Sequence, residues 1–298
     1  MNERIHYTQC PVCGSADIKN ILTVKDYTVT GELFPIAECG SCSLRFTQYV
    51  PGAASIAPYY KAENYISHTD ETKGLIGILY KKVRKRTLAN KRKLINRETK
   101  LIKGDLLDVG SGTGAFANEM LQHGWQVAGI EPDYEAKAMA KQLYSLVFTD
   151  EKELFQFPAA SFDAITMWHV LEHVHDLKGY IQQMKSLLRE DGKLFIAVPN
   201  YTSLDARIYK EFWAAYDVPR HLYHFSPFSM QKLMEKNGLK IIQYKPMRYD
   251  SFYISLLSSK YKNGKSRWLA SFWNGFRSNL NSLRKVKKCS SVIYVISK

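Results

Sequence analysis

The sequence predicts an α/β protein whose main part is a doubly wound, Rossmann-like sheet of seven strands, preceded by a small cysteine-bearing module. Three observations lead to this fold class. From residue 104 onward, short apolar runs alternate with amphipathic stretches, which is typical of parallel strands joined by helices. A glycine-rich loop at 110–114 follows the first of these runs. Four of the five cysteines lie within residues 1–50 as two CxxC pairs.

The elements of the sheet are predicted in order along the chain. Strands are expected at 105–109, 125–130, 146–148, 162–168, 193–198, 239–244 and 291–296. Helices are expected between them at 115–123, 135–144, 177–188 and 229–237. Gly124 and Gly238 stand just beyond two of these helices, where glycine commonly ends a helix. The polar run 189–192 predicts a turn before the fifth strand.

On this interpretation the chain has three parts. Residues 1–50 form the cysteine module, 51–103 an irregular linker followed by a basic helix, and 104–298 the domain that holds the sheet. An insertion at 250–290 interleaves aromatic and aliphatic residues with lysines and arginines at helical spacing, which predicts amphipathic helices. Such helices could cover a substrate site, contact a membrane surface or pack in the core.

The positive charge of the chain is unevenly distributed. The net charge is +14, from 42 Lys and Arg against 28 Asp and Glu. Residues 73–103 carry +11 and residues 240–298 carry +12, so the rest of the chain is acidic at −9. A basic chain suggests nucleic acid, an anionic membrane surface or an acidic substrate. Because the excess of positive charge lies in two segments, we expect those segments to bind an anionic partner.

Composition excludes several classes of protein. With 45% hydrophobic and 23% charged residues, the chain is an ordinary globular protein and neither disordered nor fibrous. No run of 18 uncharged apolar residues occurs, so a membrane span is not expected. The first residues lack the features of a signal peptide, so a cytoplasmic location is expected.

The four N-terminal cysteines predict a zinc site. Each CxxC pair presents two thiolates to one ion, and two such pairs complete a tetrahedral set; the residues are Cys10, Cys13, Cys39 and Cys42. Two disulfides are the competing interpretation, which a cytoplasmic setting disfavours. A thioredoxin-like redox motif needs only one CxxC, at a helix start. We expect the zinc to be structural, and the fifth cysteine, Cys289, to be a buried apolar residue.

The glycine loop predicts a nucleotide-type site. Glycine at 110, 112 and 114 lets the backbone approach a ligand closely, with Asp108 just before the loop and Glu131 at the end of the next strand. An acid at that second place can hydrogen-bond a ribose. The spacing G-x-G-x-G differs from the dinucleotide fingerprint, and no Lys-Ser/Thr follows as in a P-loop. The Asp108 carboxylate would repel a pyrophosphate but suits a cofactor with an amine and a sulfonium.

The runs LDVGSGTG, FDAITMWHVLEHVHD and LLREDGKLFIAVPN, together with Glu131, resemble the motifs of class I S-adenosylmethionine-dependent methyltransferases. The resemblance covers 104–244, and the strand at 291–296 fits the family's seventh strand. The cysteine module resembles a zinc ribbon found ahead of some sugar methyltransferases. Residues 213–226 resemble a segment of a branch associated with saccharide and natural-product gene clusters.

The resemblance implies a set of cofactor-binding residues. They are Asp108, Gly110, Ser111, Gly112, Gly114, Glu131, Pro132, Asp150, Glu151, Trp168 and His169. The glycines would hold the methionine part, Asp108 would orient it and Glu131 would hold the ribose. Each acid also has a plain structural interpretation, as a helix cap or a surface residue. The assignment of Asp150 and Glu151 to the adenine departs slightly from the family's spacing.

His169-Val-Leu-Glu172-His173 also matches the H-x-x-E-H pattern of a zinc protease. That chemistry needs both histidines on one face of a helix. Because a predicted strand runs directly into His169, we do not expect a protease.

The loop after the fifth strand is the expected acceptor side. It holds His221 as first choice for a general base, His224 as second choice, and Asp217 or Arg220 to orient the base or to bind an anionic group. A packed structural loop is the alternative. The leading hypothesis is methyl transfer to an anionic small or carrier-linked acceptor, such as a nucleotide sugar or a lipid-linked saccharide. An RNA methyltransferase and a non-catalytic cofactor-binding module are the alternatives, and the oligomeric state is not indicated.

Overall fold

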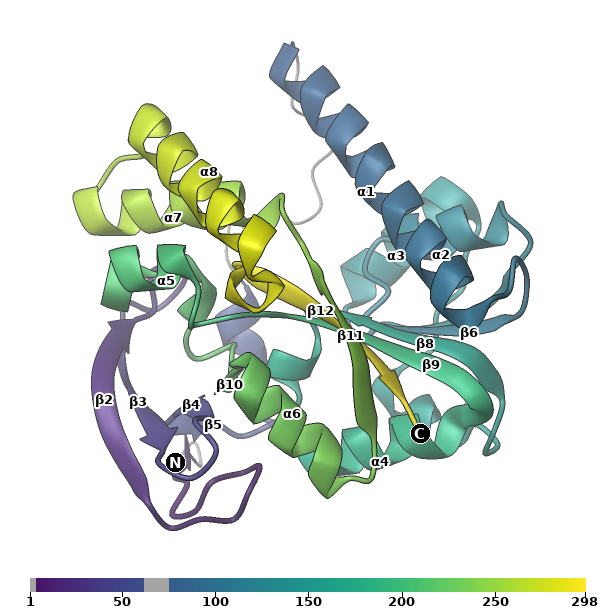
Figure 1. The fold of residues 1–298 in the computed structure, drawn as a ribbon, viewed down its shortest axis with the longest axis horizontal. Helices are drawn as coiled ribbons and strands as arrows, with labels where there is room; N and C mark the ends of the chain where they lie inside the picture. Colours follow the sequence, from purple (N-terminus) through teal and green to yellow (C-terminus); the bar gives the residue numbers. More distant parts are fainter. Residues whose placement is uncertain (1–3, 62–74) are drawn as a thin grey trace. The chain divides into compact units, whose positions relative to one another are not determined.

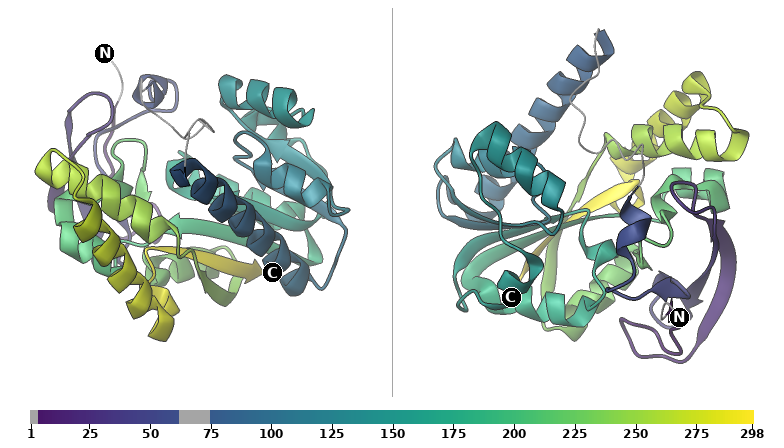
Figure 2. Two further views of the ribbon diagram at one scale, coloured as in Figure 1. Left: turned by 90° about the horizontal axis from the view of Figure 1, so that it is seen from above. Right: turned by 180° about the vertical axis from the view of Figure 1, so that it is seen from behind.

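The computed structural model describes residues 4–61 and 75–298. The chain separates into two compact units, drawn as ribbons in Figures 1 and 2. The first unit comprises residues 1–63, 169–181 and 196–294, and the second comprises 64–168, 182–195 and 295–298. Part of the predicted linker, 62–72, lies outside the described residues, and a short 3₁₀ helix at Ala57–Tyr60 lies inside them.

The second unit is built around the predicted glycine loop. Strand β6 (Asp105–Val109) pairs in parallel with β7 (Gln126–Ile130) on one side and with β8 (Phe162–Trp168) on the other. Helices α1 (Leu75–Thr99), α2 (Ala115–Leu121) and α3 (Tyr134–Tyr144) belong to the same unit, and Figure 1 shows α1 beside α2. The apolar residues of β6 are fully buried, as expected of a central parallel strand.

The strands of the large sheet stand in the order β11-β12-β9-β8-β6-β7. The further strands are β9 (Leu188–Pro199), β11 (Lys240–Pro246) and β12 (Ser291–Ser297). The Rossmann-like class is confirmed, but the sheet has six strands among the described residues and not the seven expected. The expected strand at 146–148 is replaced by a single bridge between Ile130 and Thr149. Phe148 and Leu146 pack into a small apolar cluster against α2 and α3 instead of extending a ladder.

Helix predictions are confirmed with small shifts. The regions expected to be helical contain α2, α3, α4 (Leu177–Leu187) and α6 (Pro227–Lys236). The insertion forms two helices, α7 (Asp250–Asn263) and α8 (Trp268–Arg284), which pack on one another. The turn expected at 189–192 is wrong, since β9 begins at Leu188 and includes those residues.

The first unit contains the cysteine-bearing strands. An antiparallel sheet has the order β10-β4-β3-β2, with β2 at Ile18–Lys25, β3 at Leu33–Cys39, β4 at Arg45–Thr47 and β10 at Tyr223–His224. A separate pair joins β1 (Arg4–Ile5) to β5 (Val50–Pro51). Strand β10 therefore brings a segment of the expected acceptor loop into the sheet of the cysteine module. Among the described residues, no helix is both long and apolar enough to cross a membrane.

Candidate functional site

The glycine loop has the backbone conformation that its sequence predicts. Gly110, Gly112 and Gly114 all have positive φ, where side chains other than glycine are strained. A Cβ at Gly114 would meet neighbouring side chains at 3.1 Å, so this glycine serves packing. A Cβ at Gly112 would meet nothing within 4 Å, so the backbone there borders open space. The loop thus combines one glycine needed for packing with one that a ligand can approach.

Asp108 is a buried acid at the end of β6. Its Oδ1 accepts a hydrogen bond of 2.6 Å from the Thr166 hydroxyl on β8. Burial raises the pKa of Asp108 to about 7, opposed by the Thr166 hydrogen bond and by the charge of Lys91. A carboxylate held in this way gains most from a cationic ligand, since burial without a counter-charge is costly.

Glu131 lies at the end of β7 and organises the glycine loop. One carboxylate oxygen accepts from the backbone N–H of Gly112 at 2.7 Å, and the other accepts from Asp133 N–H at 2.9 Å. Each oxygen has a second lone pair, so the carboxylate can accept further hydrogen bonds from hydroxyl groups. This arrangement suits the ribose contact that the sequence predicts.

Trp168 closes the same region from the end of β8. Its ring lies edge-to-face with Phe116, and the ammonium of Lys91 on α1 is 4.1 Å from its ring centroid. The buried Nε1 of Trp168 has no hydrogen-bond partner among the described residues. A buried N–H without a partner is unusual and is readily explained by a ligand that accepts from it.

The remaining predicted cofactor contacts are less enclosed. Ser111 is buried and donates to the Asp108 carbonyl oxygen at 2.8 Å. Pro132, Asp150 and Glu151 are exposed. Asp150 forms an ion pair with Lys137 on α3. The adenine assignment of Asp150 and Glu151 therefore stays a prediction.

The residues of the second unit fit S-adenosylmethionine. Three features supply what its amino acid and ribose groups require: the open space beside Gly112, the Trp168 N–H without a partner among the described residues, and the acids Asp108 and Glu131 at the strand ends. Thr166 and Lys91 were not predicted. Thr166 is an ordinary strand residue in the sequence, and Lys91 is one of many basic residues in the helix, so neither carries a distinguishing signal.

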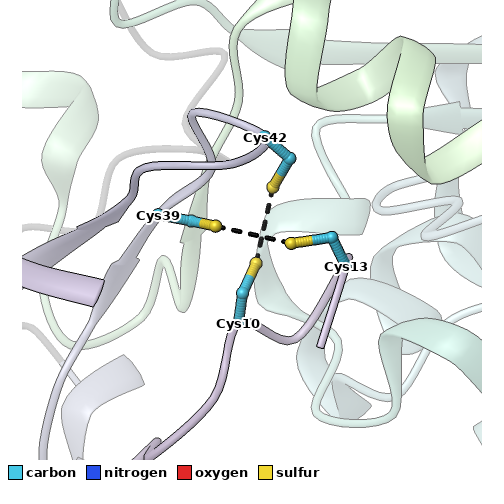
Figure 3. Close-up of side chains that lie close together, drawn as sticks. All are labelled: Cys10, Cys13, Cys39 and Cys42. Carbon is cyan, nitrogen blue, oxygen red and sulfur yellow. Dashed lines mark hydrogen bonds between the residues drawn. The ribbon is translucent and has the colours of Figure 1, made fainter. Parts of the chain in front are cut away.

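The four N-terminal cysteines converge on one point, as Figure 3 shows. All four sulfur atoms lie within 4.8 Å of one another, with 3.5 Å between Cys10 and Cys42 and 3.4 Å between Cys13 and Cys39. The hydrogen bond between Cys10 and Cys42 lowers the pKa of Cys10 to about 5 and raises that of Cys42. Tetrahedral zinc takes four thiolates at about 2.3 Å. The set could hold a structural zinc ion, as its spacing predicts.

A second cluster in the first unit joins Glu172, His173 and His221. Their ligand-type atoms also lie within 4.8 Å of one another, and the two imidazole rings meet edge-to-face at 4.5 Å between centroids. His173 Nδ1 faces the Arg220 carbonyl oxygen at 3.0 Å, and His221 Nδ1 faces the Ala215 carbonyl oxygen at 2.9 Å. A carbonyl oxygen only accepts, so in each neutral ring the proton is on Nδ1 and the lone pair is on Nε2.

Charge in this cluster is distributed over neighbouring histidines. Burial and the nearby His221 lower the pKa of His173 to about 4, so this ring is neutral. Burial opposes charge on His169 too, but hydrogen bonds to Asp250 and Glu172 dominate and raise its pKa to about 10. His169 is thus an imidazolium that pairs with Asp250 at 2.9 Å, and its role as a cofactor-binding residue stays a prediction.

Glu172 has no predicted role in the site, although the structure places it at the centre of this cluster. Its Oε1 lies 3.3 Å from His169 Nδ1, while its fully buried Oε2 has no partner among the described residues. The only sequence signal was the H-x-x-E-H pattern, which pointed to a protease. The structure confirms that His169 directly follows a strand, and Glu172 and His173 lie in a 3₁₀ turn (Leu171–His173).

The other acceptor-loop residues have structural partners. Arg220 is buried, and its Nη2 donates to the Asp217 carboxylate and to the Thr28 hydroxyl; its predicted contact with an anionic group stays a prediction. Asp217 Oδ2 lies 3.7 Å from His221 Nε2, too far for a hydrogen bond but close enough to stabilise a positive charge on that ring. His224 is buried beside the Thr47 hydroxyl at 3.1 Å, and burial holds its pKa well below the usual value. This contact between β10 and β4 favours a packing role over that of second base.

The fold and the glycine-loop site together define a Rossmann-like methyltransferase. Residues 80–244 match the family described as a methyltransferase domain, and the chain belongs to this family. The methyltransferase domain thus contains the glycine-loop site, whose residues fit S-adenosylmethionine.

Curated relatives share part of the chain. The mitochondrial ubiquinone biosynthesis O-methyltransferase of Bos taurus is 30% identical over 164 residues, which cover 49% of this chain and 44% of that protein. The ubiquinone biosynthesis O-methyltransferase of Xanthomonas axonopodis pv. citri is 30% identical over 158 residues, covering 49% and 66%. The chain therefore spans less than two thirds of the length of either relative.

A solved structure shares the fold. The magnesium protoporphyrin IX methyltransferase of Synechocystis PCC 6803 aligns with a TM-score of 0.50 at 14% identity, covering 77% of this chain and 90% of that chain. At this identity the likeness shows the fold alone.

Proposed function

We propose that the protein transfers a methyl group to a hydroxyl oxygen of an anionic acceptor, either a small molecule such as a nucleotide sugar or a carrier-linked saccharide. The observation that carries the proposal is the arrangement of His221. Its Nδ1–H is held by the Ala215 carbonyl, which fixes the ring and leaves Nε2 as a base. Residues of this type and placement are expected where an acceptor hydroxyl must lose a proton.

The proposed reaction is a direct transfer of the methyl group from sulfur to oxygen. S-adenosylmethionine, when bound, supplies a methyl group on a sulfonium that leaves as a neutral thioether. The acceptor oxygen forms the new C–O bond as the C–S bond breaks, and the hydroxyl proton passes to Nε2 of His221. The buried Glu172 carboxylate and Asp217 then stabilise the imidazolium that results. Solvent removes this proton before the next turnover.

Two features support the acceptor class. The segments 73–103 and 240–298 carry +11 and +12, whereas the rest of the chain is acidic, so the basic segments favour an acceptor that carries phosphate or carboxylate. The curated relatives are named as O-methyltransferases, which supports oxygen as the acceptor atom. The saccharide class rests on the resemblance of the zinc-ribbon module and of residues 213–226.

The test is a transfer assay with methyl-labelled S-adenosylmethionine. Nucleotide sugars, lipid-linked saccharides and RNA are offered to the protein, and label in each product is measured. We expect label in an anionic saccharide, with turnover reduced roughly 10²–10⁴-fold by His221→Ala. His123→Ala is the matched control, because His123 is a half-exposed histidine of the second unit, on the surface beside α2.

Two results would count against the proposal. Label in RNA alone, with RNA affinity that falls steeply as salt rises, would identify a nucleic-acid methyltransferase. Unchanged turnover in His221→Ala would remove the base and leave only the methyltransferase class. Calorimetry with S-adenosylmethionine on each variant shows whether the cofactor site has survived.

A further inference from the structure

We propose that the α7–α8 hairpin docks the protein on an anionic phospholipid surface. The hairpin is the segment 250–288, none of whose residues takes part in the proposed proton transfer. The inference does not depend on the methyl acceptor, and it concerns where the protein works.

The exposed face of α8 is apolar. Trp268 is 67% exposed and Leu269 89%, and one turn further on Phe272 is 63% and Trp273 57% exposed. Phe276 and Leu280 continue the same stripe at helical spacing. Single exposed apolar residues are normal on a protein surface, but a continuous stripe of six large ones marks an interaction site.

The buried face of α8 is made of small and polar residues. Ser271, Ser278 and Ser282 are buried, and a Cβ at Gly275 would meet Phe252 at 2.9 Å. The Ser278 hydroxyl donates to the buried carboxylate of Asp205 at 2.7 Å. The helix is thus fixed to its own unit through hydroxyl groups and close contact. The large apolar side chains of α8 lie on its exposed face, because the buried face packs too closely to accommodate them.

Charge identifies the surface that this stripe fits. Residues 250–288 carry nine Lys or Arg and one acid, and α8 itself has no acid. Eight of the basic residues flank the stripe in the sequence, and the ninth, the exposed Arg277, lies within α8. Lys260, Lys262, Lys265 and Arg267 precede the stripe, and Arg284, Lys285, Lys287 and Lys288 follow it. Trp and Phe between clusters of Lys and Arg favour the interface of an anionic bilayer, where rings enter the headgroup region and cations meet lipid phosphates.

A second copy of the chain would present the same positive charge and would be repelled. An anionic lipid surface meets both the apolar stripe and the charge, so it is the occupant that the observations favour. Because the described part of the chain holds no membrane-spanning helix, the contact is peripheral.

Vesicle co-sedimentation tests the proposal. The full chain is mixed with vesicles of phosphatidylglycerol and phosphatidylcholine in equal parts, and separately with phosphatidylcholine alone. We expect binding to the anionic vesicles only, weakening as salt rises. The double variant Trp268→Ser/Leu269→Ser should lower the partition coefficient by about tenfold or more, because burial of even one large apolar side chain is worth roughly that factor.

The matched control is Leu33→Ser/Ile102→Ser, which removes two apolar side chains that are 65% and 76% exposed elsewhere on the molecule. It should bind like the parent protein. Equal S-adenosylmethionine affinity shows that both double variants are folded. Three outcomes would overturn the proposal: no binding to anionic vesicles, unchanged binding by the α8 variant, or a dimer in sedimentation velocity that the α8 variant dissociates.

Discussion

Two groups of side chains in the first unit have their ligand-type atoms close enough together for a metal site, but the groups differ in the hydrogen bonds that surround them. The four cysteine sulfurs make their closest contacts with one another, across two CxxC turns. In the cluster of Glu172, His173 and His221, each histidine is already held by a backbone carbonyl, and Glu172 is paired with the charged His169. The arrangement of the cysteines therefore suits metal binding alone, whereas the histidine cluster also suits proton transfer.

The contrast shows that proximity alone does not define a metal centre. Thiolates crowded together repel one another unless a cation neutralises them, so a zinc ion would stabilise the cysteine set. Glu172 is paired with the imidazolium of His169, so the charge of the second cluster is balanced without an ion.

Removal of the cysteine site should have the largest effect. Cys39→Ser leaves three thiolates, and zinc binding to such sites is worth roughly 10–16 kcal/mol in zinc-finger peptides. We expect loss of bound zinc and unfolding of the sheet β10-β4-β3-β2, read out by metal analysis and by hydrogen exchange at residues 18–47. Cys289→Ser is the control, because Cys289 is buried away from the cluster and should leave the zinc content at one ion per chain.

The histidine cluster should respond in activity and not in metal content. Glu172→Gln removes the charge that stabilises an imidazolium on His221, so we expect turnover to fall roughly 10²-fold or more. Zinc should stay at one ion per chain. A parent protein with two ions, reduced to one by Glu172→Gln, would break the comparison and assign the second cluster to metal binding.

The two clusters also differ in how far the sequence predicts them. The cysteines lie in two short CxxC motifs, and this spacing by itself predicts a metal site. Glu172 and His221 are 49 positions apart, and only the fold brings them together. The pattern that contains Glu172 pointed to a protease because sequence spacing does not show how the chain turns after β8.

The same distinction holds for the fold. The glycine loop and the strands flanking it are local features, and the structure has them where the sequence predicts them. The segment 146–148 looks like a strand because it is apolar, but its side chains fill space beside α2 and α3. The outward stripe of α8 could be predicted as amphipathic, but which face is buried depends on Ser278 meeting Asp205, residues far apart in the sequence.

Asp108 differs from both clusters, because we expect a bound ligand to supply the counter-charge of its buried carboxylate. Its pKa of about 7 lies above the usual value because of burial, so below pH 7 the apo protein holds it protonated. S-adenosylmethionine needs the carboxylate form, so affinity should fall about tenfold for each pH unit below 7. Calorimetry between pH 5 and 8 measures this slope. Asp108→Asn should bind weakly and without the slope, and an equal slope in that variant would assign the titration to another group.

The smallest effect is expected from His169 and His173, which lie four residues apart and have opposite pKa shifts. The folded pKa of His169, about 10, lies above its unfolded value near 6.5, so its pairing with Asp250 stabilises the protein below pH 6.5 and is lost as pH rises through 10. The pKa of His173, about 4, is lowered, so stability is lost as pH falls from 6.5 towards 4.

Because the His169 side chain is a third exposed, its contribution to the free energy of unfolding should be about 1 kcal/mol or less. Urea unfolding of the zinc-loaded protein at pH 6.5, 8 and 10 gives the alkaline limb. Asp250→Asn should flatten that limb and leave the acid limb unchanged, and an unaltered alkaline limb would show that His169 is not the group that titrates.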